Sequence, residues 1–294
     1  MKTIFAFSLL FCAALCLDRP LDGEYIKGVL KVGGKGVDVS NGISVTANHL
    51  YITGTFQHEA NVGGKKIETI HGGEKNCDIF VACYRRLDAT LKWVNVAGGP
   101  GRDYGIKVVV NEADTKVYVI GWVDNQKRDG HSKGKNIVFS NAPFMKYLNT
   151  KDGAETPGRK ADVAYLACYS VDDGKLEWAR PIVSLEDDAR AYGVDVQTVL
   201  GKDYIYVCGS HEGNTVFYGK KSRDVLENVN TKNDFFVAKF DSDGWVMWAR
   251  SGGGSGKDEA FGITVDDSVV YITGYFDGHY SNAYIASYQG EAED

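Results

Sequence analysis

The chain has 294 residues, and its 33 Lys or Arg against 39 Asp or Glu give a formal net charge of -6 at pH 7. This acidic balance argues against a nucleic-acid partner, because phosphate binding needs a basic surface. The length allows one large domain with a substantial core. The 35 Gly, 17 Tyr and only 5 Pro are typical of strands joined by tight turns.

The first sixteen residues have the pattern of a secretory signal peptide. Lys2 precedes an apolar stretch from Ile4 to Leu15, and Ala14-Leu15-Cys16 matches a small-x-small cleavage site. A membrane anchor is the alternative, but a bilayer span needs about 20 apolar residues. We therefore expect residues 1–16 to be removed. Residues 17–294 should form a single domain that is secreted, monomeric and without a membrane span.

One pattern recurs four times after this segment. It starts near residues 42, 105, 193 and 262, as GISVTANHLYITGTF, GIKVVVNEADTKVYVIGWV, GVDVQTVLGKDYIYVCGS and GITVDDSVVYITGYF. Each copy holds two alternating segments, A and B, and a third segment C follows (DIFVACY, DVAYLACY, DFFVAKF, NAYIASY). The first three copies continue into a segment D (LKWVNV, LEWARP, VMWARS). Four short alternating segments per copy predict an all-β repeat architecture.

The two ends of the repeat region predict how the sheets are arranged. The segment GVLKVGGKG at 28–36 aligns with WVNVAGGPG at 93–101, so it reads as a segment D without its own A, B and C. The last copy stops after segment C. We predict a β-propeller of four blades, each of four antiparallel strands, closed by pairing of Leu30–Gly34 with the strand around Ala283–Tyr288. The alternative is half of a larger ring completed by a second chain.

These segments resemble a known family. The stretches from Tyr51 to Tyr84 and from Asp234 to Phe276 are similar to the SBBP β-propeller repeat of secreted proteins. That resemblance implies the architecture and not an activity, because the fold carries many functions. The family name refers to seven blades, whereas four copies are counted in this sequence.

Four cysteines follow the signal segment: Cys77, Cys83, Cys168 and Cys208. Cys83 and Cys168 occupy the same position of segment C in two different copies. Equivalent positions of different blades lie too far apart for a disulfide, which needs Cα atoms within about 7 Å. We therefore predict that Cys83 and Cys168 are not bonded to each other.

The segments between B and C carry the candidate ligand-binding residues, because loops on a rigid scaffold commonly do so. The longest, from Asp124 to Ala161, has eight Lys or Arg against four acids, and we select Lys133, Lys135, Arg159 and Lys160. We add His211 from the third copy. Trp122 and Tyr275 follow the glycines of segment B and could stack on a sugar ring.

Candidates for catalysis and metal binding are weaker. The carboxylates Asp103, Asp187, Asp188, Asp258 and Glu259 lie between segments D and A, but no motif pairs them. Nucleophile elbows, phosphate-binding loops and HExxH spacing are missing from the sequence. Five of the six histidines fall in B–C segments without metal-ligand spacing. We therefore assign no catalytic residue, metal or cofactor.

Together these features predict a secreted, non-catalytic recognition module. Its partner would be an extracellular glycan or protein, an anionic one if the basic insertion takes part. The alternatives are a structural component of an extracellular matrix and, third, a propeller hydrolase or lyase.

Overall fold

The computed structural model describes residues 14–16, 27–29, 31–70, 76–124, 137–139, 142–143, 161–227, 232–267, 269–277 and 281–289. Every regular element in these ranges is a β-strand, and neighbouring strands pair antiparallel. The expected all-β class is therefore confirmed. The described ranges hold no apolar helix of membrane-spanning length.

Each repeat forms one sheet, in the strand order of the sequence. Sheet I consists of β4 (Val39–Val45), β5 (His49–Phe56), β8 (Asp78–Arg85) and β9 (Leu91–Gly98). Sheet II consists of β10 (Tyr104–Val110), β11 (Lys116–Asp124), β14 (Asp162–Ser170) and β15 (Leu176–Ser184). Sheet III consists of β16 (Ala189–Val199), β17 (Lys202–His211), β20 (Asp234–Phe240) and β21 (Val246–Gly252). Sheet IV consists of β22 (Asp258–Asp266), β23 (Val269–Asp277) and β24 (Ser281–Gln289).

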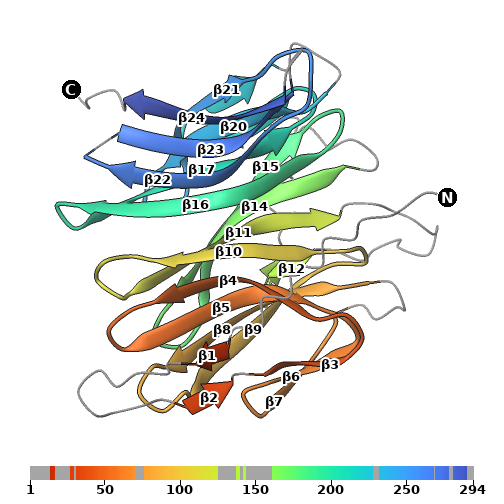
Figure 1. The fold of residues 1–294 in the computed structure, drawn as a ribbon, viewed down its shortest axis with the longest axis vertical. Coiled ribbons are helices and arrows are strands. Elements are labelled where there is room, and N and C mark those ends of the chain that lie inside the picture. Colours follow the sequence, from red (N-terminus) through yellow and green to blue (C-terminus); the bar gives the residue numbers. More distant parts are fainter. Residues whose placement is uncertain are drawn as a thin grey trace.

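The four sheets form an open stack. Their first strands β4, β10, β16 and β22 lie side by side in that order, and sheets I and IV lie at opposite ends (Figure 1). Adjacent sheets meet face to face. The central strands β8 and β14 are accordingly buried at nearly every position, because both faces of their sheets are covered. The repeat assignment from the sequence therefore matches the strands one by one, whereas ring closure is not seen.

The predicted pairing of the N-terminal strand is wrong in this structure. Strand β3 (Val32–Lys35) pairs with β6 (Glu59–Val62), which pairs in turn with β7 (Lys65–Glu68). Strand β24 pairs with β23. The pairing fails because β3 and β24 lie at opposite ends of the stack (Figure 1). The small sheet β3-β6-β7 covers the outer apolar side of sheet I, where Ala60, Val62 and Ile67 pack with Leu50 and Ile52.

The B–C segments contain strands that extend the preceding sheet. In the second repeat β12 (Val138–Phe139) joins β9 and pairs with β13 (Ala142–Pro143). In the third, β18 (Thr215–Tyr218) joins β15 and pairs with β19 (Arg223–Leu226). Near the N-terminus β1 (Ala14–Cys16) pairs with β2 (Lys27–Val29). Of the expected signal peptide only residues 14–16 are described, so it stays a prediction.

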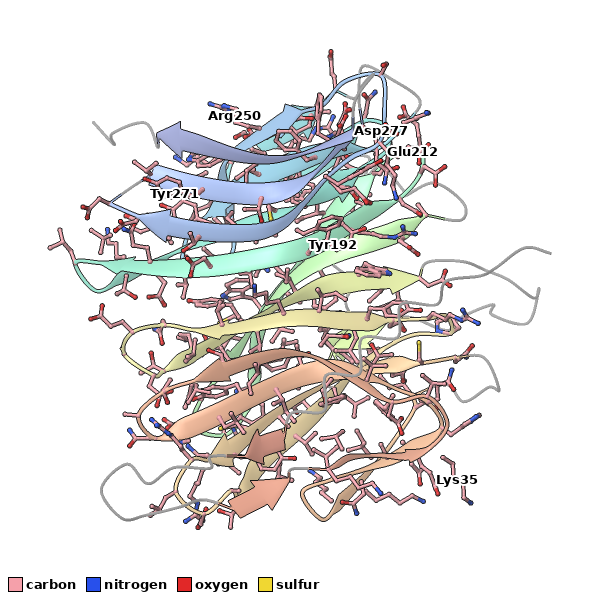
Figure 2. All side chains as sticks on the ribbon, in the orientation of Figure 1. Lys35, Tyr192, Glu212, Arg250, Tyr271 and Asp277 are labelled. Atoms are coloured by element: carbon pink, nitrogen blue, oxygen red, sulfur yellow. The ribbon has the colours of Figure 1, made fainter. Side chains whose placement is uncertain are left out.

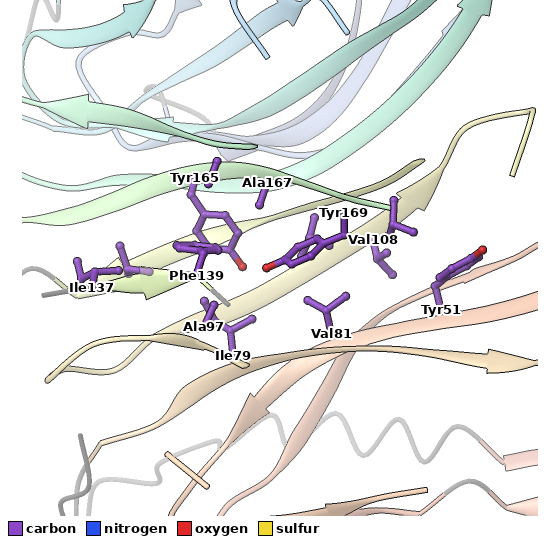
Figure 3. Packing of buried hydrophobic residues seen from close by; sticks show 14 of the residues in the cluster. Tyr51, Ile79, Val81, Ala97, Val108, Ile137, Phe139, Tyr165, Ala167 and Tyr169 are labelled. Atoms are coloured by element: carbon purple, nitrogen blue, oxygen red, sulfur yellow. The ribbon is translucent and has the colours of Figure 1, made fainter. Parts of the chain in front are cut away.

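Apolar side chains fill the layers between the sheets. Between sheets I and II, Val81 of β8, Val108 of β10 and the rings of Tyr165 and Tyr169 on β14 belong to one buried layer (Figure 3). Between sheets II and III, Leu166 and Trp178 pack with Phe236 and Phe240. A smaller cluster joins sheets III and IV. The core is thus divided into layers, one for each pair of neighbouring repeats.

Polar contacts recur at equivalent places between neighbouring sheets. The hydroxyl of Tyr51 donates to Asp114 Oδ1 at 2.6 Å, and that of Tyr118 donates to Asp203 Oδ2 at 2.7 Å. The indole of Trp93 donates to the backbone carbonyl of Val171 at 2.8 Å. Such pairs fix the register of one sheet on the next, because each buried donor is satisfied only in that position.

The cysteine prediction is confirmed. Cys77, Cys83, Cys168 and Cys208 are free and buried. Cys83 packs in the layer between sheets I and II, whereas Cys168 packs in the layer between sheets II and III. The two thiols therefore belong to different interfaces and act as small core residues.

Candidate ligand-binding site

A row of aromatic side chains crosses sheets II, III and IV where their first strands begin. Tyr104 on β10 and Trp122 on β11 are cross-strand neighbours, with ring centroids 4.9 Å apart. Trp122 lies 5.6 Å from Tyr192, and Tyr192 lies 5.3 Å from Phe261, both edge to face. Tyr192, labelled on β16 in Figure 2, is half-buried and lies between Trp122 and Phe261 in this row. Trp122 on β11 bridges Tyr104 and Tyr192, which, like Phe261, precede the glycine that starts their repeat.

β-Bulges direct Tyr192 and Phe261 away from the regular pairing, whereas in sheet II the bulge skips Ile106 and Tyr104 stays paired with Trp122. The register shifts between Ala191 and Gly193 and again between Ala260 and Gly262, which leaves Tyr192 and Phe261 outside the ladder. The same shift in sheet I leaves Asn41 outside it. A bulge re-aims a side chain without ending the sheet.

A groove of about 490 Å³ lies at the first-sheet end of the row. Trp122 and Tyr104 form its aromatic wall, and Asn41 and Gln57 bring carboxamides. Its remaining lining residues are Val37, Val39, Thr55, Cys77, Arg102 and Ile106. Both the size and the combination of apolar walls with a few polar groups are typical of small-ligand sites.

Several polar atoms of the groove have hydrogen-bonding capacity left. Asn41 donates from Nδ2 to the carbonyl of Gly105 at 2.9 Å, and Gln57 accepts from the backbone N–H of Val37 at 3.0 Å. No other described residue bonds Asn41 Oδ1, Gln57 Nε2 or the indole N–H of Trp122. These bonds hold the two carboxamides in place, so one acceptor and two donors are positioned for a ligand.

The indole of Trp122 also contacts a cation, the guanidinium of Arg190 on β16. The guanidinium carbon of Arg190 lies 5.7 Å from the indole centroid. Arg190 donates to Asp162 Oδ2 at 2.8 Å and to Asp188 Oδ2 at 2.6 Å. Burial, together with the charge of Asp188, raises the pKa of Asp162 to about 6 although Arg190 opposes the shift. This network restricts the indole plane, which lowers the entropy that a ligand would have to remove.

The structure separates the predicted site residues. Trp122 is half-buried and lines the groove. Tyr275 is half-buried on β23 opposite Glu259 and does not line it. Lys133, Lys135, Arg159 and Lys160 lie outside the described residues.

His211 is not on a loop surface, and this part of the prediction is corrected. It ends β17 and is completely buried. Its Nδ1 lies 3.0 Å from Thr215 Oγ1 and its Nε2 lies 2.9 Å from Ser251 Oγ. Burial lowers the pKa of His211 to about 4. Both ring nitrogens are therefore used inside the protein, and we remove His211 from the site.

Carboxylates between segments D and A accept hydrogen bonds from backbone N–H groups. Asp103 accepts N–H groups from Gly99 at 2.6 Å and Asp124 at 2.9 Å. Asp258 accepts from Gly254 at 2.7 Å and Asp277 at 3.0 Å. Asp38 makes the same two contacts, with Gly34 and Gln57. A G-G-x-G-x-D motif thus recurs three times and ties the D–A loop to the end of strand B.

Asp78 lies beside one of these motifs. A Cβ atom added to Gly98 would lie 2.5 Å from Asp78 Oδ1 and 2.8 Å from Asp103 Oδ2, so both carboxyl groups border this glycine. Burial raises the pKa of Asp78 to about 7, and burial together with the nearby Asp78 raises that of Asp103. Within the described ranges no group of three or more His, Cys, Asp or Glu is arranged to hold a metal.

Sequence reasoning missed most of the groove. Tyr104 and Asn41 stand at the recurrent position before the repeat glycine, a pattern that does not by itself indicate a groove. Gln57 and Arg102 carry no local signal, because the groove forms only where the first two sheets meet. No protein-family model matches this chain, and a search of curated proteins found no similar one.

Proposed function

We propose that this protein is a secreted recognition module with SBBP-type β-propeller repeats and that it binds a glycan in the groove beside Trp122. The observation that carries the proposal is the joined aromatic surface of Trp122 and Tyr104, with the carboxamides of Asn41 and Gln57 at its edge. No catalytic step is part of this proposal.

The chemistry of the groove suits a sugar ring. A pyranose presents a face of C–H groups, which packs on the electron-rich face of an aromatic ring. Its edge presents hydroxyl groups, which both donate and accept and therefore match the acceptor of Asn41 and the donors of Gln57 and Trp122. Arg102 is the one cation among the lining residues, so an acidic sugar would gain a charge-assisted bond there.

A glycan array probed with the mature chain tests this proposal, followed by calorimetry on the best ligand. Trp122→Ala should weaken binding at least tenfold, which corresponds to about 1.4 kcal/mol. Trp245→Ala is the matched control, because Trp245 is also half-buried and contacts a guanidinium, that of Arg180 at 4.0 Å, at the opposite end of the strands. Unchanged affinity in Trp122→Ala, or no glycan bound at all, would contradict the proposal.

The basic insertion is a second, separable part of the proposal. Single surface ion pairs contribute only about 0–1 kcal/mol, so only the cluster can add measurable affinity. Replacing Lys133, Lys135, Arg159 and Lys160 by Gln should weaken binding of an acidic glycan and flatten its dependence on salt. An affinity that ignores both the substitutions and the ionic strength would limit the site to the groove.

A further inference from the structure

Sheet I, at one end of the stack, exposes on its first strand the face that is buried in sheets II, III and IV. Ile43 of β4 pairs with Ile52, and the equivalent residues Val108, Val194 and Ile263 pair with the matching residue of their own B strand. Ile43 is 50% exposed, whereas the other three are 1%, 2% and 8% exposed. The difference arises because sheets II, III and IV each have a preceding sheet against this face.

At the other end of the stack, sheet IV exposes the face that sheets I, II and III each pack against the following sheet. Tyr271 on β23 is 39% exposed, whereas its equivalents Tyr51, Tyr118 and Tyr206 are 0%, 1% and 2% exposed. Figure 2 shows Tyr271 in the sheet at the end of the stack. The hydroxyls of Tyr51 and Tyr118 donate to an Asp in the A–B turn of the following sheet. In sheet I the exposed Asn48 stands where sheet III has Asp203, three residues before the recurrent tyrosine.

Strand β3 has the geometry of a strand D without its sheet. Val32 pairs with Val62 of the adjoining B–C hairpin, just as Ala97 pairs with Phe139 and Ile182 with Phe217. Gly33 and Gly98 follow with φ of 155° and 154°. The backbone N–H of Gly34 is held by Asp38 as that of Gly99 is held by Asp103.

The edge that such a strand would join is on sheet IV. Strand β24 occupies the place of strand C, and it pairs only with β23 among the described strands. In sheet I, strand C pairs with strand D so that Ile79 is opposite Ala97. The same register would place Ala283 opposite Val32. Within one chain β3 and β24 lie at opposite ends of the stack (Figure 1).

We propose that a second copy of this chain completes the stack. Sheet IV of one copy packs on sheet I of the other, and β3 of each copy pairs with β24 of its partner. A two-fold axis makes both contacts at once and closes a ring of eight sheets. Tyr271 of one copy then covers Ile43 of the other and donates to its Asn48, as the tyrosines inside the chain donate to aspartates.

A second copy is the partner that fits, because the two end surfaces are the two halves of one interface that the chain already makes three times. It also pairs the exposed strand edges, which are otherwise a cause of aggregation. This inference specifies the alternative of a ring completed by a second chain, in place of the predicted monomer, and it does not depend on the glycan proposal.

Light scattering on the mature chain provides the first test, with twice the chain mass as the expected result. Tyr271→Lys and Ile43→Lys should each give monomers with an unchanged far-ultraviolet circular dichroism spectrum. Leu200→Lys is the matched control, since Leu200 is 99% exposed in the A–B turn of sheet III. A monomeric wild-type protein would overturn the proposal.

Cross-linking distinguishes two copies from a single closed chain. Val32→Cys and Ala283→Cys are made as separate variants, mixed, and treated with a short bismaleimide. The reagent should not react with the four native thiols, because they are buried. We expect a product of twice the chain mass with a peptide joining positions 32 and 283. A product of single-chain mass in the double variant, with none in the mixture, would show that one chain closes on itself and would overturn the proposal.

Discussion

The C–D turns of sheets II and III contain a glycine where the C–D turn of sheet I contains an alanine. The glycine allows the tryptophan of the preceding sheet to pack on the turn. Gly174 has φ of 72° in the C–D turn of sheet II, and a Cβ atom there would lie 2.5 Å from the ring of Trp93. Gly244 stands in the same relation to Trp178. In sheet I the turn holds Ala89, also with positive φ of 54°. No tryptophan of a preceding sheet is packed on that turn in this structure, so an alanine is tolerated.

We expect Gly174→Ala to destabilise the protein and Ala89→Gly not to. Left-handed backbone costs an L-residue about 1–2 kcal/mol, and in Gly174→Ala the new methyl group must also displace Trp93. The reverse change removes that cost at position 89 and adds only unfolded-state entropy of about 0.5–1 kcal/mol. Urea unfolding of both variants checks this. Equal losses of free energy of unfolding would contradict the proposed contact.

Buried carboxyl groups make the stability dependent on pH. Asp78 is fully buried, and its Oδ1 has no hydrogen-bond partner among the described residues. Its Oδ2 accepts the backbone N–H of Ile70 at 2.5 Å. Burial raises its pKa from 3.8 to about 7, so the folded protein keeps a proton that the unfolded chain releases.

The contribution of Asp78 to the free energy of unfolding should therefore fall as pH rises between about 4 and 7. In this window the native state binds the extra proton, so the slope contributed by Asp78 reaches about 1.4 kcal/mol per pH unit. His211 acts in the opposite direction, because its pKa of about 4 costs stability as pH falls below its ordinary value of 6.5. Asp78→Asn isolates the carboxyl group while retaining an acceptor for Ile70. A wild-type profile that differs from this variant by a constant would exclude the effect.

Hairpins that a sequence would assign to loops belong to the folded body. The B–C hairpin of the third repeat adds β18 and β19 to sheet II. Phe217 on β18 is completely buried, and its ring meets Phe236 of sheet III edge to face at 5.3 Å. The hairpin therefore connects sheets II and III in addition to strand pairing within one sheet.

Phe217→Ala should reduce the free energy of unfolding by about 3–5 kcal/mol, the usual cost of emptying a buried phenylalanine site. Val225→Ala on β19 is the control, since Val225 is 43% exposed and should change stability by less than about 0.5 kcal/mol. Chemical denaturation of both variants gives the comparison. Similar small effects would mean that the hairpin is a surface loop without a part in the core.

At the scale of the whole molecule, the core is a series of layers, each closed by its own pair of sheets. The thiols of Cys83, Cys168 and Cys208 lie in three successive layers. Cys77 lies at the loop end of sheet I, where it forms an isolated bridge with Arg102. Burial raises the pKa of Cys77 to about 11 and those of Cys83 and Cys208 to about 12, which suppresses their thiolates.

If residues 1–16 are removed as the sequence predicts, the four remaining thiols should be unreactive in the native state. At pH 8 we expect no labelling by an aromatic disulfide reagent without denaturant, and four thiols per chain in denaturant without reductant. The order of labelling at low denaturant then reports which layer opens first. Fewer than four thiols in the denatured, unreduced chain would reveal a disulfide and contradict the free cysteines.

The sequence by itself determined the strands, their order within each sheet and the separation of Cys83 from Cys168. These features depend on alternation over a few residues and on pairing between neighbours in the chain, so each repeat carries them independently. Trp122 follows the glycine of segment B, and Asn41 and Tyr104 precede the repeat glycine, but neither pattern indicates a groove.

Only the tertiary structure decided where β3 pairs, that His211 is buried, and that Trp122 joins Gln57 and Arg102 while Tyr275 does not. Each of these results depends on contacts between segments far apart in the chain, which no local pattern records. That the stack has two open ends was likewise decided only by the tertiary structure. A repeat sequence specifies how each sheet packs on the next, but the accumulated geometry of all four sheets decides whether the last one meets the first.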